Sequence, residues 1–432
     1  MKQKLFVISM DAMVREDVAE LLKRPNFRKI MEKRAEVNEV CSVYPASTYP
    51  AHSTLITGCY PKGHGVYCNF SLQTHSDGVA HWPVESSGIF AEDIFSAAKK
   101  AGCTTAAVYW PITANNPNID HVINEYFFYY PDEGIRVEEV FADQGADAAA
   151  LSAVRENLRL FPRATAQGEP TETLFDSFLM GCTCSLIRDR RPDVLFVHNC
   201  CLDSLRHKGG VFGTGLPAAL DRVDAWLGDV VSAMEEAGVY EDTNFVILSD
   251  HGQRDCTRTV RLNVLLEQEG LIRLSPKETV YTWQAYSQSN GMSSTVYLSD
   301  NTNEKLYERV YACLKKLQAT GKYGIEKILT KEELAERYGQ SGPFSFFVEA
   351  QEGVRFINDL TGDAVSTHPT VGAHGYMPEK GPKPIFMGRG PAFREGAVLE
   401  QARLVDAAPT LAAILGQTLP DADGRALTEL LK

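Results

Sequence analysis

The sequence contains no long hydrophobic run. No stretch approaches the ~18 consecutive apolar residues that a transmembrane helix needs. The apolar run near the N-terminus is also too short for the hydrophobic region of a signal peptide. We therefore expect a cytoplasmic protein that does not contact a membrane.

Positive charge is scarce. The chain has 43 Lys and Arg against 56 Asp and Glu, which gives a formal net charge of −13. Proteins that bind long nucleic acids normally present a basic face, so we expect no long nucleic acid, DNA or RNA, as a partner. An acidic protein can still bind a small phosphorylated substrate where bound metal ions supply positive charge locally.

Cysteine pairs with metal-binding spacing are absent. Cys182 and Cys184 are one residue apart and Cys200 and Cys201 are adjacent, so neither pair has the two-residue gap of a zinc knuckle. The 10 cysteines are scattered over 432 residues, unlike the framework of a small disulfide-rich domain. We expect most of them to be reduced residues of the core.

Short apolar runs alternate along the chain with helical patterns that end at glycine. This alternation predicts an α/β fold with a mainly parallel sheet flanked by helices, whose ligands bind beyond the carboxyl ends of the strands. The predicted strands are Leu5 to Ser9, Ala106 to Trp110, Val194 to Val197, Phe245 to Leu248 and Ile385 to Met387; the predicted helices include Ala91 to Ala101, Leu220 to Met234 and Val405 to Leu415.

Residues 255–365 interrupt this alternation. They mix helix-like stretches, at 304–317 and 331–338, with strand-like ones, at 294–298 and 345–348. A chain of this length also exceeds the size at which a single hydrophobic core usually stops growing. We predict a core formed by residues 1–254 and 366–432, with an inserted cap at 255–365.

Four separated segments place aspartate or histidine where strands give way to loops. Each residue alone has an ordinary structural explanation, such as a helix cap or a hydrogen-bonded core histidine. Together they offer three carboxylates and three imidazoles, a set of nitrogen and oxygen ligands that suits zinc. The candidates are Asp11, Asp203, His207, Asp250, His251 and His374.

The window PASTYPAHSTLITGCYPKGHGVYCN, residues 45–69, resembles the nucleophile segment of the type I phosphodiesterase/nucleotide pyrophosphatase family of the alkaline phosphatase superfamily. The matching positions are Thr48, Tyr49, Pro50 and His52, followed by the turn TGCYPKGHG. Related sulfatases carry a cysteine in place of Thr48, so their formylglycine chemistry is excluded here.

The resemblance continues through the motifs DSLRH, SDHGQ and GAHGY and into the C-terminal segment. It implies an alkaline phosphatase-like core that binds two Zn²⁺ per chain, with another divalent transition metal as the alternative. The implied ligands are Asp203, His207 and His374 for one ion and Asp11, Asp250, His251 and the Thr48 oxygen for the other.

The resemblance also implies a mechanism in which Thr48 attacks phosphorus and forms a phospho-threonine intermediate, which water then hydrolyses. Asn69 lies where the family has an amide that hydrogen-bonds the phosphoryl oxygen, although a turn asparagine is the alternative. Tyr49 is similar to the family's aromatic residue that packs against a nucleobase. His198 stands five residues before Asp203, where the family commonly has tyrosine; it either contacts the substrate or faces the core.

The expected substrate is therefore a small, nucleotide-like phosphodiester or phosphoanhydride. The alternative is another phosphorus hydrolase on the same scaffold, either phosphonoacetate hydrolase-like or a phosphomonoesterase, because the fold does not decide between them. A non-catalytic phosphate-binding protein is disfavoured, since Thr48 and all six candidate ligands are present. The sequence indicates no oligomeric state.

Overall fold

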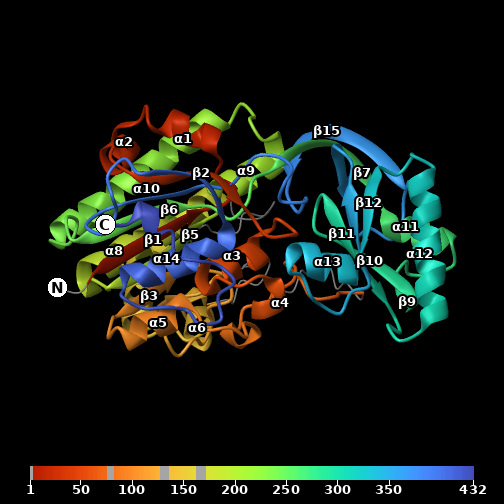
Figure 1. Cartoon of the computed structure of the whole chain (residues 1–432), viewed down its shortest axis with the longest axis horizontal. Helices are drawn as coiled ribbons and strands as arrows, with labels where there is room; N and C mark the ends of the chain where they lie inside the picture. Colours follow the sequence, from red (N-terminus) through yellow and green to blue (C-terminus); the bar gives the residue numbers. More distant parts are fainter. Residues whose placement is uncertain (1–2, 75–81, 127–135, 162–171) are drawn as a thin grey trace.

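The computed structural model describes residues 3–74, 82–126, 136–161 and 172–432. It contains a large sheet covered by helices and, beside it, a smaller region of separate sheets, with β15 reaching from one to the other (Figure 1). No helix in the described ranges combines the length and the hydropathy needed to cross a bilayer.

The large sheet has eight strands in the order β17-β2-β16-β6-β1-β5-β3-β4. Strand β1 lies at its centre and pairs in parallel with both β5 and β6, whereas β16 runs antiparallel to its two neighbours. The predicted mainly parallel α/β sheet is thus confirmed. Its strands are β1 (Lys4–Met10), β2 (Ala35–Cys41), β3 (Thr105–Val108), β4 (His121–Ile123), β5 (Val194–Asn199), β6 (Thr243–Leu248), β16 (Phe386–Arg389) and β17 (Val398–Arg403).

Successive residues of β1 enter two hydrophobic cores on opposite faces of this sheet. Phe6 and Ile8 pack into one core, whereas Leu5 and Val7 pack into the other. Burial of both faces explains why the central strands read as continuous apolar runs.

The first core includes side chains from α2 (Pro25–Met31), α8 (Glu172–Arg190) and α10 (Leu216–Glu236); the second includes side chains from α3 (Thr48–Thr57), α5 (Ile94–Lys100) and α14 (Ala407–Ile414). The other helices of this region are α1 (Arg15–Leu21), α4 (Pro61–His64), α6 (Val137–Asp143), α7 (Ala148–Asn157) and α9 (Cys201–Gly209). The last predicted helix is shorter than expected, because its first residues form a 3-10 turn over Leu404–Asp406.

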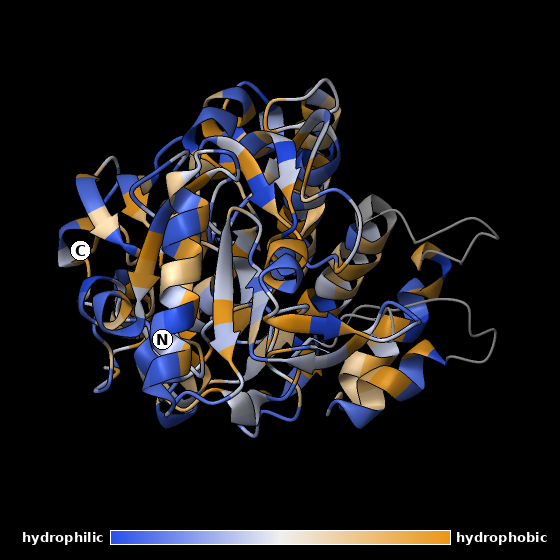
Figure 2. Cartoon of the chain, turned by 90° about the vertical axis from the view of Figure 1, so that its right-hand side faces the viewer, coloured by the Kyte–Doolittle hydropathy of each residue, from blue (hydrophilic) through white to orange (hydrophobic). Residues whose placement is uncertain are grey.

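The strands between residues 254 and 373 belong to three smaller sheets. These are β14-β7-β15, β10-β11-β13-β12 and β8-β9, built from β7 (Arg254–Val260), β8 (Ile272–Leu274), β9 (Val280–Trp283), β10 (Ala285–Ser289), β11 (Ser293–Leu298), β12 (Ile325–Thr330), β13 (Phe346–Ala350), β14 (Gly353–Phe356) and β15 (Val365–Ala373). The helices here are α11 (Leu262–Gln268), α12 (Glu304–Ala319) and α13 (Lys331–Tyr338). Figure 2, viewed from this side, shows hydrophilic and hydrophobic residues alternating along the helices. The boundaries predicted for the cap stay a prediction.

The carboxyl ends of the central strands face this smaller region. Asp11 follows β1, α9 follows β5, and Asp250 follows β6. Helices α3 and α9 lie between the sheet and the cap elements in Figure 1. Because β15 pairs with β7 and then re-enters the core, it brings His374 to the same edge.

Candidate active site

Thr48 is the first residue of α3. The preceding Ser47 is extended, with φ −145° and ψ 158°, so the helix begins abruptly at the threonine. The first backbone N–H groups of a helix have no partner within it and carry partial positive charge. The side chain of Thr48 is mostly buried, and its hydroxyl lies 3.4 Å from Nε2 of His251. The N-terminus of α3 and the hydroxyl of Thr48 therefore lie at the same place, beside His251.

A deep group of three candidate ligands lies beside Thr48. Asp11, Asp250 and His251 are all buried, and one ligand atom from each lies within 4.8 Å of the others. Nε2 of His251 is 3.1 Å from Oδ2 of Asp250 and 3.6 Å from Oδ1 of Asp11. The residues come from the ends of β1 and β6, so the parallel sheet itself brings them together.

A second, more open group is formed by Asp203, His207 and His374. Nε2 of His207 lies 3.3 Å from Oδ2 of Asp203, and the His207 side chain is 37% exposed. The ring of His374 stacks on that of His251 at 4.3 Å between centroids, so the two groups adjoin. Solvent therefore reaches the site from the side of His207.

The tautomers of two histidines suit metal binding. Nδ1 of His207 donates to the carbonyl of Gly372 at 3.0 Å, and Nδ1 of His251 donates to the carbonyl of Gly252 at 3.2 Å. Burial lowers the pKa of His251 to about 4, which keeps it neutral. In both rings Nε2 faces carboxylate oxygens, and an Nδ1 that donates to a backbone carbonyl is typical of metal-binding histidines. Although burial opposes the shift, the Asp203 carboxylate raises the pKa of His207, so a metal ion would replace a proton at its Nε2.

Several buried atoms in these groups also need a cation. Oδ1 of Asp11, Oδ2 of Asp250 and Nδ1 of His374 have no hydrogen-bond partner among the described residues. Burial raises the pKa of Asp250 to about 6, and burial together with Asp250 raises the pKa of Asp11 well above its usual range. Uncompensated buried carboxylates are costly, so these residues fit divalent metal ions.

Asn69 lies next to the start of α3, as the sequence predicted. Its Oδ1 accepts a hydrogen bond of 2.9 Å from the backbone N–H of Tyr49. This contact fixes the amide with its Nδ2 left to donate. The structure therefore brings one side-chain donor to the residue that follows Thr48.

Tyr49 is itself only 1% exposed. Its ring packs against Trp82 at 4.9 Å between centroids, and Trp82 packs against Phe70 at 4.2 Å. Trp82, which is half-buried, therefore covers the predicted stacking surface of Tyr49. Sequence reasoning missed Trp82 because no motif contains it.

His198 is completely buried, which favours the core-facing alternative over a substrate contact. Its Nε2 lies 3.2 Å from Oδ2 of Asp11, and its Nδ1 lies 3.3 Å from the carbonyl of Tyr109 and 3.5 Å from Oε1 of Glu125. Its polar contacts are therefore with the protein. Its position five residues before Asp203 marked it as a candidate site residue, but did not predict its contact with Asp11.

His52 supports the nucleophile segment from within the core. Its Nδ1 donates to the carbonyl of Thr48, and its Nε2 accepts from the hydroxyl of Ser9, both at 2.9 Å. Burial and the neighbouring His198 hold the pKa of His52 well below its usual range, in keeping with this neutral tautomer. The first turn of α3 is thereby fastened to β1.

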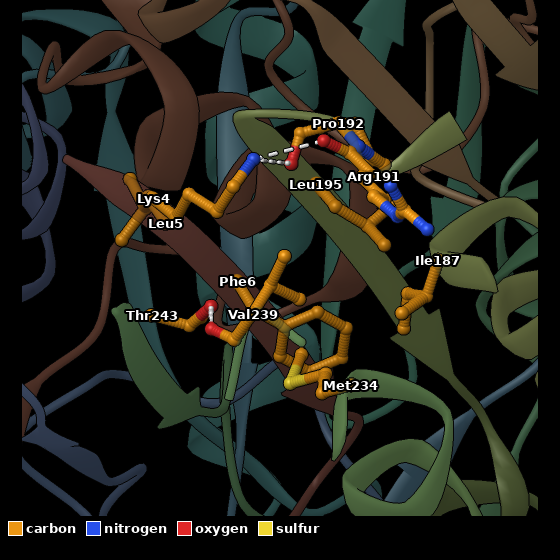
Figure 3. Close-up of a pocket in the computed structure, with 10 residues that line it drawn as sticks. All are labelled: Lys4, Leu5, Phe6, Ile187, Arg191, Pro192, Leu195, Met234, Val239 and Thr243. Carbon is orange, nitrogen blue, oxygen red and sulfur yellow. Dashed lines mark hydrogen bonds between the residues drawn. The ribbon is translucent and has the colours of Figure 1, made fainter. Parts of the chain in front are cut away.

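A small cavity occurs at the opposite end of the sheet (Figure 3). It lies where β1 and β5 begin, between Phe6, Leu195 and Met234. Lys4 is its only ammonium group among the described residues, and that group donates to the carbonyls of Arg191 and Pro192. The cavity therefore offers no arrangement of groups for chemistry.

A threonine at a helix N-terminus, beside two adjoining Asp and His groups at the carboxyl edge of an α/β sheet, defines a metal-dependent hydrolase of phosphoric esters. The sequence model of the type I phosphodiesterase / nucleotide pyrophosphatase family matches residues 5–377, and the chain belongs to that family.

Curated relatives agree with this membership. A bis(5'-adenosyl)-triphosphatase of Xenopus laevis is 24% identical over 96% of this chain and 78% of its own length. Ectonucleotide pyrophosphatase/phosphodiesterase family member 5 of Homo sapiens is 24% identical over 96% of this chain and 75% of its own.

Solved structures share the fold. The human ectonucleotide pyrophosphatase / phosphodiesterase 5 aligns with a TM-score of 0.67 at 20% identity, covering 100% of both chains. A murine form of that protein, solved in complex with AMP, aligns with a TM-score of 0.66 at 20% identity, again over 100% of both chains. The predicted alkaline phosphatase-like fold is therefore confirmed.

Proposed function

We propose that this phosphodiesterase cleaves phosphodiester or phosphoanhydride bonds of small, nucleotide-like substrates through a phospho-Thr48 intermediate. The observation that carries the proposal is the position of Thr48. Its hydroxyl opens α3 and lies 3.4 Å from Nε2 of His251, within the deep ligand group. A hydroxyl needs such surroundings, because a free threonine is a poor nucleophile.

The metal-dependent site fits two Zn²⁺ per chain, with another divalent transition metal as the alternative. Imidazole nitrogen and carboxylate oxygen favour zinc over magnesium, which prefers oxygen ligands and water. The proposed ligands are Asp203, His207 and His374 for one ion and Asp11, Asp250, His251 and Thr48 for the other. When bound, such ions activate the attacking oxygen and offset the charge of the leaving oxygen.

Thr48 is the proposed nucleophile. Its Oγ1 forms a bond to phosphorus while the bond to the leaving oxygen breaks, and water later displaces Thr48. Asn69 Nδ2 and the backbone N–H of Thr48 donate to the phosphoryl oxygens as their charge grows, whereas the N–H of Tyr49 is already bonded to Asn69 Oδ1. His52 holds the carbonyl of Thr48, which keeps the attacking residue in place.

A nucleotide-like substrate is supported by the relatives. One of them is named for bis(5'-adenosyl)-triphosphate hydrolysis, and a related structure contains AMP. In this chain the cluster of Tyr49, Phe70 and Trp82 adjoins the nucleophile. Aromatic faces stack on any base, and we propose that this cluster receives the base, with Trp82 providing its exposed surface. The cytoplasmic location stays a prediction.

The test compares a diester and a monoester that carry the same chromogenic leaving group. We expect the diester to be turned over far faster. Slower turnover of the diester would favour the monoesterase alternative, and cleavage of a phosphonate alone would favour the phosphonoacetate hydrolase-like one.

A chiral phosphorothioate diester tests the covalent step. Two successive in-line displacements, each inverting at phosphorus, give net retention of configuration. Net inversion would mean that water attacks directly, and Thr48 would then be at most a positioning residue.

A further inference from the structure

We infer that His198 and Glu125 are positioning residues, which hold the Asp11 carboxylate in the orientation in which it binds metal. The inference rests on the proposed function, since that proposal makes Asp11 a ligand. It adds two residues that no motif of the chain contains.

The two oxygens of Asp11 have different surroundings. Oδ2 accepts a hydrogen bond of 3.2 Å from Nε2 of His198. Oδ1 has no hydrogen-bond partner among the described residues and lies 3.6 Å from Nε2 of His251. The protein therefore engages one oxygen and leaves the other directed towards the deep ligand group.

His198 is in turn held from its other side. Its Nδ1 faces the carbonyl of Tyr109 at 3.3 Å and Oε1 of Glu125 at 3.5 Å. Its ring packs on that of His52 at 4.2 Å between centroids. The thiol of Cys200 also lies 3.6 Å from Nε2 of His198. Because the contacts with Asp11, Tyr109 and Glu125 are all to oxygen acceptors, rotation of His198 would cost it the bond to Asp11.

Glu125 completes the chain of contacts. It is 1% exposed and follows β4, at the edge of the sheet, whereas His198 lies in β5 and Asp11 follows β1. The three residues thus form a line across the carboxyl edge of the sheet. A carboxylate buried at this depth is costly unless it has a polar partner, and the structure places Nδ1 of His198 3.5 Å from Oε1 of Glu125.

Partners of this kind fix the orientation of a metal ligand, and their loss typically costs about 10- to 100-fold in metal affinity. The experiment uses the zinc-loaded full chain, titrated with a chromophoric chelator. The variants are His198→Asn and Glu125→Gln, with the buried His64→Gln and Asp93→Asn as matched controls. Neither control residue contacts a candidate ligand in a described interaction.

We expect one of the bound zinc ions to be lost at about 10- to 100-fold lower chelator concentration in His198→Asn. The change in Glu125→Gln should be smaller and in the same direction, and the controls should match the wild type. Because Glu125 acts through His198, adding Glu125→Gln to His198→Asn should have little further effect. A purely structural role predicts additive losses and a lower melting temperature of the metal-free proteins.

Three results would overturn the inference: unchanged zinc retention in both variants, additive effects in the double variant, or equal losses in the controls. If His198→Asn fails to fold, Glu125→Gln alone decides by the same criterion. A wild-type protein that retains zinc but does not cleave diesters would refute the proposed function, while the zinc measurements would still decide the role of His198. A wild type that retains no zinc refutes both.

Discussion

Replacement of Asn69 by aspartate exchanges a single NH₂ group for oxygen. In the structure Oδ1 of Asn69 accepts from the N–H of Tyr49 at 2.9 Å, and the side chain is 9% exposed. Aspartate has nearly the same size and can keep that bond. The only group removed is Nδ2, the donor assigned to the phosphoryl oxygen. The substitution therefore separates the catalytic role of Asn69 from its structural role.

The magnitude follows from what a donor to developing charge contributes. Loss of one such donor typically lowers turnover by about 10²- to 10³-fold, or about 2.7–4 kcal/mol of transition-state stabilisation. Aspartate also places a carboxylate oxygen beside the anionic phosphoryl group, so we expect Asn69→Asp to lie at or beyond the upper end of this range. Asn69→Ala loses the same donor without the added repulsion, and also loses the bond to Tyr49, worth about 1 kcal/mol of stability.

The assay is kcat/KM for a chromogenic diester, with metal content and thermal unfolding measured on the same samples. We expect Asn69→Asp to match the wild type in metal content and to be at least as impaired as Asn69→Ala. Near-normal turnover of Asn69→Asp would show that Nδ2 does not donate in the transition state. Asn69 would then be a turn residue that only secures Tyr49.

Thr48→Ala should keep fold and metals but lose nearly all turnover, whereas Thr48→Ser should retain measurable activity because the attacking oxygen survives; near-normal rates for a folded Thr48→Ala would contradict this. Asp250→Ala should lower metal content, measured by elemental analysis, and should reduce turnover more than Asn69→Ala does; full metal retention would argue against Asp250 as a ligand. Trp82→Ala should raise KM for a nucleotide diester by roughly fivefold or more and leave a diester without a base unaffected; equal effects on both would exclude stacking. Burial raises the pKa of Glu349 from 4.5 to about 6, so its contribution to the free energy of unfolding is full below pH 4.5 and falls by about 2 kcal/mol as the pH rises through 6. Glu349→Gln should remove this pH dependence in urea titrations, and an unchanged pH profile would refute it.

The sheet and the principal site residues could be predicted because their signals are local. The central strands are buried on both faces, so each appears as an uninterrupted apolar run whatever its neighbours are. The carboxyl ends of parallel strands share one edge, which made Asp11 and Asp250 candidates for one site before their distance was known. Asp203 and His207 on α9, and His374 after β15, were predicted from motifs, and the structure brings them together at the same edge of the sheet.

The surroundings of those residues could not be predicted in the same way. Glu125 and Trp82 belong to no motif, and each contacts the site only because distant segments pack there. His198 occupies a position that suggested substrate contact, but the direction of a side chain in β5 depends on which face of the sheet is filled at that end.

The sequence alone therefore determined the fold class, because periodicity is a property of the chain itself. It also predicted the nucleophile and the metal ligands, because the motifs that resemble those of the family are local. Only the tertiary structure decided that Tyr49 is covered by Trp82 and that His198 is buried between Asp11 and Glu125. The physical reason is that burial and hydrogen-bond partnership depend on which elements pack side by side. Strand order brings the end of β4 to the edge shared by β1 and β5, and no local pattern in the sequence encodes that order.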